Sequence, residues 1–178
     1  CGDIKPHEYS MELFLDMAWD MSNFKDSKSV ETHKLNWNTN TFGAKNAKSI
    51  TKVMNAYDAL AFQRRPEFMA WSTVEPVTKA GKTEFTQFHY ADEVTRRINA
   101  YQKLMDDVKA IKTNIAENRQ DAFYQLVHYP VIGAASINHK WLYAYKNHFV
   151  ASQGRQSASY FGKKSAEAYN TIIAETEY

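Results

Sequence analysis

Four side chains able to carry charge lie within the first eight residues of the chain. They are Asp3, Lys5, His7 and Glu8, with Gly2 ahead of them and Pro6 among them. Side chains of these types transfer protons and bind charged substrates. Such a density in a segment stiffened by proline is similar to a site loop at the mouth of an α/β barrel. A polar linker whose charges cap the following helix explains the same pattern, so both interpretations stay open at this point.

Two rows of like charge recur at helical spacing. The acidic row is Glu12, Asp16 and Asp20, and the basic row is Lys45, Lys48 and Lys52. Carboxylates that act as an acid and a base need an environment that separates their pKa values, whereas an acidic row on a helix is usually solvated or paired with lysines. A phosphate-backbone site would need a continuous cationic patch. We therefore interpret both rows as ordinary helix faces.

The four tryptophans fall into two groups. Trp37 and Trp71 lie in segments predicted to be irregular, where an exposed ring could stack on a sugar. Buried packing is the more common role of such rings, because they dominate core energetics. Trp19 and Trp141 lie at helical spacing and are predicted to be core residues.

The sequence offers no motif for a metal or a nucleotide. The six histidines form no H-x-x-x-H pair and no cysteine accompanies them, so we predict no embedded metal site. The few glycines are scattered and form no phosphate-binding loop. We expect no cofactor.

Hydrophobic periodicity indicates an all-α fold with about five helices. Four of the predicted helices cover residues 10–24, 44–65, 90–116 and 155 to the end. The remaining one starts near residue 121, kinks or breaks at Pro130, and continues to about residue 150. Residues 25–43 are predicted to be a long polar connection with a short helical turn at about 30–36, and residues 66–81 to be irregular. Without a convincing strand, these helices form a bundle.

The first predicted helix is apolar over most of its circumference. Met11, Phe14, Leu15, Met17 and Trp19 leave only the acidic row polar. A helix of this kind is expected to sit deep in the assembly, with the acidic row reaching solvent or a partner.

Composition limits the class of protein further. The chain has 178 residues, 44% of them hydrophobic and 14% aromatic, with six Gly and four Pro, which indicates a globular domain. A net charge of +2, from 22 basic and 20 acidic residues without long runs, argues against a nucleic-acid partner. No apolar run is long enough to span a membrane, and the single cysteine, Cys1, permits no intramolecular disulfide. The first residues include no Met, from which we expect that the chain is a fragment of a larger multidomain protein.

Short motifs along nearly the whole chain resemble those of the glycoside hydrolase family 115 α-glucuronidases. In that family a G-D-[LI]-K-P-x-E loop precedes a helical domain, as residues 2–8 and then 14–19 do here. The other similar segments follow in the same order: Phe42-Gly43, Arg65-Pro66-Glu67, residues 121–127 with Tyr129-Pro130, and residues 151–155.

The resemblance implies an architecture and an activity. The family combines an N-terminal α/β domain, a catalytic (β/α)₈ barrel, a helical bundle and usually a C-terminal β-sandwich. Residues 1–9 would then be the loop leaving the barrel, and residues 10–178 the bundle. The family removes glucuronic acid or its 4-O-methyl form, linked α-1,2 to xylose in glucuronoxylan, generally with inversion. The acid and base that this requires would lie outside the chain, so the chain alone is expected to be inactive.

The resemblance also implies site residues and partners. Asp3, Lys5 and Glu8 would lie at or beside the active-site mouth, with Lys5 meeting the uronate carboxylate and Asp3 or Glu8 orienting a sugar hydroxyl or the catalytic groups. Implied partners are glucuronoxylan or its oligosaccharides, bound by the full-length protein, and the adjacent barrel domain; a homodimer stays open. The family implies a secreted or periplasmic protein.

A second class of function competes with this one. A stand-alone helical module that binds another protein through its apolar faces fits the same five helices. The two interpretations predict different surfaces, because a bundle separated from its neighbouring domains exposes a large apolar patch and a free module only a modest one.

Overall fold

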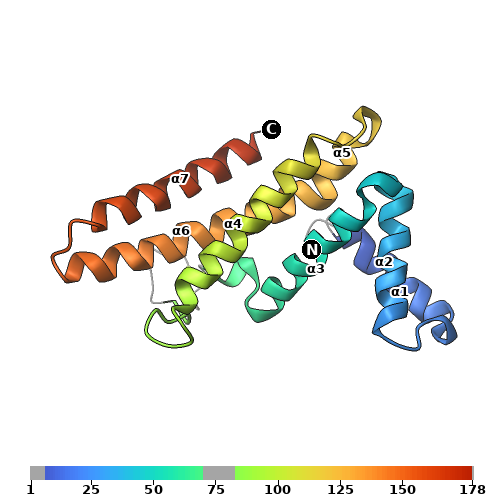
Figure 1. Ribbon diagram of the computed structural model, residues 1–178, viewed down its shortest axis with the longest axis horizontal. Helices are drawn as coiled ribbons and strands as arrows, with labels where there is room; N and C mark the ends of the chain where they lie inside the picture. The colour runs from blue at the N-terminus through green and yellow to red at the C-terminus, as the bar shows by residue number, and fades with distance from the viewer. Residues whose placement is uncertain (1–6, 70–82, 178) are drawn as a thin grey trace. The chain divides into compact units, whose positions relative to one another are not determined.

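The computed structural model describes residues 7–69 and 83–177, and this part of the chain is helical with no strand. The all-α prediction is confirmed. The α-helices are α1 (Glu8–Trp19), α2 (Ser27–Phe42), α3 (Ala44–Gln63), α4 (Glu93–Lys112), α5 (Gln120–Phe123), α6 (Tyr129–Ser152) and α7 (Ala158–Thr176) (Figure 1). Short 3₁₀ turns cover Met21–Asn23, Pro66–Met69 and Glu117–Arg119. None of the helices in the described ranges is long and apolar enough to cross a membrane.

The chain divides into two compact units. Unit 1 consists of Cys1–Tyr57 and Asp106–Pro130, and unit 2 of Asp58–Met105 and Val131–Tyr178. Helices α3, α4 and α6 each contribute residues to both units.

Helix α2 corrects the prediction of a long polar connection over residues 25–43. The segment is a 16-residue helix, Ser27–Phe42. It begins with a capping box, in which the Asp26 side chain accepts from the backbone N–H of Ser29 and the Ser29 hydroxyl accepts from the N–H of Asp26. It ends at Gly43, whose φ of +88° suits a residue without a Cβ. Local capping thus starts and stops a helix whose interior is mostly polar.

An aromatic cluster forms much of the core of unit 1. The Trp37 ring meets Tyr9 and Phe42 edge-on at centroid distances of 5.4 and 5.9 Å, and Phe42 meets Phe123 at 5.9 Å. Trp37, Phe42 and Phe123 are all buried. Edge-to-face contacts of this kind add to the stabilisation from area burial.

Unit 2 is organised around α4 and α6. Val94, Ile98 and Leu142 form a buried cluster, and Phe85 and Tyr145 pack against it. Helix α7 lies along α6 (Figure 1), where the Ser165 hydroxyl donates to the carbonyl of Lys140 and the Tyr143 and Phe161 rings stack at 6.3 Å. Helix α4 begins at Glu93, later than predicted, because Tyr90, Ala91 and Asp92 all have a φ of +53°.

The helix predicted to kink or break at Pro130 continues through it, and the irregularity lies just before this residue. The five residues Tyr124–His128 form a π-helical segment between α5 and α6, and Pro130 follows in the first turn of α6. A proline in a helix lacks one N–H and clashes with the carbonyl four residues earlier. The wider π turn accommodates it without ending the helical path.

Candidate functional site

Helix α1 turns its acidic row toward α2. Glu12 accepts a hydrogen bond from Nε1 of Trp37 at 2.9 Å, and Oδ2 of Asp16 lies 2.9 Å from Nε2 of His33. An ionised carboxylate only accepts hydrogen bonds, so His33 donates here. The acidic row was predicted to reach solvent or a partner, and its first two members are exposed while they also hold α1 to α2.

The opposite side of α1 is apolar and exposed. It carries Met11, Phe14, Leu15 and Trp19, which we call the α1 apolar face; their exposed fractions are 44, 69, 60 and 93%. The prediction that Trp19 is a core residue and that this helix sits deep in the chain is therefore wrong for the chain taken by itself. Four large apolar side chains at i, i+3, i+4 and i+8 form a contiguous strip, and such exposed strips mark interaction surfaces.

Asp20, the last member of the acidic row, ends α1 and opens the following 3₁₀ turn. Its carboxylate accepts from the backbone N–H of Ser22 at 2.9 Å and from the side chain of Asn23 at 3.0 Å. Hydrogen bonds from Ser22, with a smaller contribution from Asn23, lower the pKa of Asp20. They outweigh desolvation, which by itself would raise this pKa. All three acids thus have a local structural partner.

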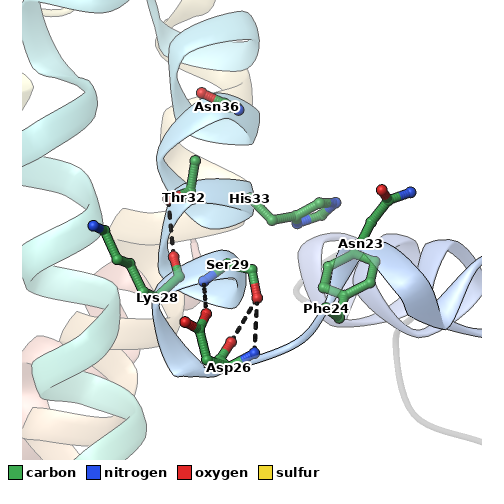
Figure 2. A pocket seen from close by; sticks show the side chains of 8 residues that line it. All are labelled: Asn23, Phe24, Asp26, Lys28, Ser29, Thr32, His33 and Asn36. Atoms are coloured by element: carbon green, nitrogen blue, oxygen red, sulfur yellow. Dashed lines mark hydrogen bonds between the residues drawn. The ribbon is translucent and has the colours of Figure 1, made fainter.

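A polar pocket of about 420 Å³ lies beside the first turns of α2. Its lining includes Asn23 and Phe24 from the segment after α1, and Asp26, Ser29, Thr32 and His33 from the start of α2. Figure 2 shows His33 extending from α2 toward Asn23, while the Asp26 and Ser29 side chains each bond to the backbone of the other residue at the helix start. Most polar side chains that line this pocket therefore already make hydrogen bonds within the protein.

Glu12, Asp16 and His33 are the group within the described residues that could hold a metal ion. One ligand atom from each lies within 4.8 Å of the others. Both acids are exposed, and each already has a protein hydrogen-bond donor. The contact between helices explains this cluster, and we assign no metal to it. A search of the sequence for an H-x-x-x-H pair could not find this group, because its residues come from two different helices.

Of the predicted site residues, the structure describes Glu8 and Trp37. Asp3, Lys5 and Trp71 lie outside the described residues. Glu8 is the first residue of α1 and is half-buried. Trp37 belongs to α2 rather than to an irregular segment and is only 6% exposed, so its ring packs inside unit 1 and we do not retain it as a sugar platform.

One buried charged residue was missed by sequence reasoning. Arg97 on α4 is 3% exposed and donates to the carbonyls of Leu60 and Arg64 and to Oδ1 of Asn138, at 3.2, 2.9 and 2.8 Å. Desolvation lowers the pKa of Arg97. Its place between Val94 and Ile98 on the apolar side of α4 is the signal that could have identified it.

Comparison with known proteins gives a family match for the first part of the chain. Residues 1–68 match the model of glycosyl hydrolase family 115. A comparison with curated proteins gives no match.

A solved structure of one member resembles the whole chain. It is that of BtGH115A, described as a family GH115 4-O-methyl-α-glucuronidase with specificity for decorated arabinogalactans. The similarity has a TM-score of 0.77 with 34% sequence identity, and it covers 99% of this chain but 22% of that one. The chain is therefore similar in sequence and fold to one helical portion of a much longer glycoside hydrolase.

Proposed function

We propose that this chain is the helical domain of a family 115 glycoside hydrolase that releases α-linked glucuronic acid or its 4-O-methyl form from a plant polysaccharide. The observation that carries the proposal is the similarity to the 4-O-methyl-α-glucuronidase over 99% of the chain at 34% identity. The family match over residues 1–68 supports it independently, because it includes the segment that leads into α1.

The role of the domain is to support the catalytic barrel. The α1 apolar face supplies the docking surface, since Phe14, Leu15 and Trp19 expose more than half of their surface here. We propose that the catalytic barrel of the same longer protein covers the α1 apolar face, because this chain covers only 22% of the solved structure that it resembles. A stand-alone interaction module is expected to expose a smaller patch.

The first residues connect the domain to the chemistry. Residues 1–9 are proposed to leave the barrel, with Lys5 donating to the uronate carboxylate and Asp3 or Glu8 orienting a sugar hydroxyl. The acid and base that cleave the glycosidic bond, with inversion, belong to the barrel. The longer protein is proposed to be secreted or periplasmic, where plant polysaccharides are met.

The test is release of the uronic acid by the longer protein. It is incubated with glucuronoxylan and, separately, with an arabinogalactan that carries 4-O-methylglucuronic acid. We expect release from at least one polymer, and the comparison decides between xylose and galactose as the linked sugar. Absence of release from both, by a folded protein, contradicts the proposed activity.

A variant of Glu8 separates a site role from a structural one. Glu8→Gln keeps the shape of the side chain and removes its charge, so a role at the active-site mouth predicts roughly a tenfold or greater loss of turnover with little change in Tm. A lower Tm with unchanged turnover would show that Glu8 only holds the domains together.

A further inference from the structure

A groove in unit 1 runs between α2 and α3 and adjoins the pocket in Figure 2, with which it shares Lys28 and Thr32. Its volume is about 450 Å³. Lys28 and Leu35 line it from α2, and Lys48, Lys52 and Asn55 line it from α3. We call it the α2–α3 groove. Figure 2 shows Lys28 extending from the start of α2 toward α3.

The charge of the groove favours an anion. Lys28, Lys48 and Lys52 are exposed, and Glu31 is the acidic residue among the lining side chains. Within the described part of the chain, none of these three lysines has a carboxylate partner. Exposed lysines that line one depression and have no carboxylate partner attract a carboxylate or a phosphate.

The neutral groups of the groove suit a sugar better than a bare ion. The Lys34 ammonium, 8% exposed, donates to Oδ1 of Asn55 at 2.8 Å. This hydrogen bond fixes the amide of Asn55 and leaves its Nδ2 donors for the hydroxyls of a ligand. Leu35 is half-buried and adds an apolar surface against which the C–H groups of a sugar ring can lie.

We propose that the α2–α3 groove binds a uronic acid-bearing oligosaccharide. Lys28, Lys48 and Lys52 meet the uronate carboxylate, while Asn55 and Leu35 contact the ring. The choice of a uronate among anions rests on the proposed function. A second site of this kind would hold a decorated polysaccharide near the enzyme by adding to its avidity.

The test is a calorimetric titration of the 178-residue chain with three probes at equal ionic strength. They are a xylo-oligosaccharide carrying 4-O-methylglucuronic acid, the same oligosaccharide without it, and inorganic phosphate. We expect only the uronate-bearing oligosaccharide to bind measurably, and Lys52→Gln to weaken it about tenfold, as loss of one charge-assisted hydrogen bond predicts. The matched control is Lys45→Gln, which removes the same charge from an exposed position of α3 that does not line the groove.

Several outcomes overturn the proposal. They are absence of binding, equal binding of the undecorated oligosaccharide, tighter binding of phosphate, and an equal loss of affinity in Lys45→Gln. Each is distinguishable from failure of the proposed function, because the longer protein would still release the uronic acid from its polymer.

Discussion

Arg97 joins three segments of unit 2 through one side chain. Its guanidinium donates to two carbonyls at the end of α3 and to Asn138 on α6, and it lies over the Phe85 ring at 4.4 Å. The last carbonyls of a helix have no partner within the helix. Arg97 donates to the carbonyls of Leu60 and Arg64 at the end of α3, just before the 3₁₀ turn that begins at Pro66.

Replacing Arg97 should destabilise unit 2 strongly. Arg97→Met keeps most of the volume but removes the guanidinium donor from the Arg64 carbonyl and from Asn138 and leaves the Leu60 carbonyl only the N–H of Arg64, so we expect a loss of about 3 kcal/mol of unfolding free energy. The neighbouring Arg96 is exposed, and Arg96→Met should change stability by less than about 0.5 kcal/mol. Urea unfolding of both variants measures this, and equal effects would contradict the role of Arg97.

Asp92 makes the stability of the start of α4 depend on pH. Its carboxylate accepts from the backbone N–H and hydroxyl of Thr95 and from Lys146. Desolvation raises the pKa of Asp92, but the hydrogen bonds from Thr95 and the charge of Lys146 outweigh it and lower the pKa. A lowered pKa in the folded state contributes stability above the unfolded pKa of about 4, and this is lost as pH falls through the folded value.

Asp92→Asn should therefore destabilise only where the carboxylate is ionised. Asparagine keeps the capping geometry and removes the charge, so the loss at about pH 7 is expected to stay below about 1 kcal/mol, because solvent screens this half-exposed group. Thermal unfolding at a series of pH values should show the variant and the parent converging below about pH 3. A difference that persists in acid would assign the effect to geometry rather than to charge.

At the scale of elements, sequence periodicity predicted α3, α4 and α7 because each has an apolar stripe, and it predicted α6 from its recurring apolar residues. It missed α2, whose buried positions include Lys34 and Asn38, so that its inner face is not apolar. The N-cap Asp26 with Ser29, and Gly43 at the end, were the local signals that could have found it.

The orientation of α1 could not be predicted from its own residues. An apolar helix is expected to be buried, but which side faces this chain depends on partners elsewhere. Trp37 and His33 lie on α2, the helix that was missed, and they bind Glu12 and Asp16. Glu12 and Asp16 therefore bind α2 while staying exposed, Tyr9 is the buried residue of α1, and the α1 apolar face points outward. Most contacts of the candidate site could not be predicted from sequence patterns for the same reason, because they join residues of two different helices.

At the scale of the whole molecule, the exposed strip on α1 and the similarity to part of a longer hydrolase have one explanation. A strip with Trp19 93% exposed is costly for a free domain, and burial of such surface is the main source of stability in domain contacts. We propose on this basis that α1 is an interface helix of a longer hydrolase, held to α2 through Glu12 and Asp16 and with the α1 apolar face toward the barrel.

Hydrogen exchange of the α1 amides tests this claim most directly. It is measured on the 178-residue chain and on the longer protein under identical conditions, with α7 as the internal reference. The account predicts that amides of Glu8–Trp19 exchange at least about tenfold more slowly in the longer protein, because docking adds to the free energy of local opening. Equal exchange of α1 in both proteins would show that the α1 apolar face is not covered by the barrel, and would contradict the proposed role of this domain.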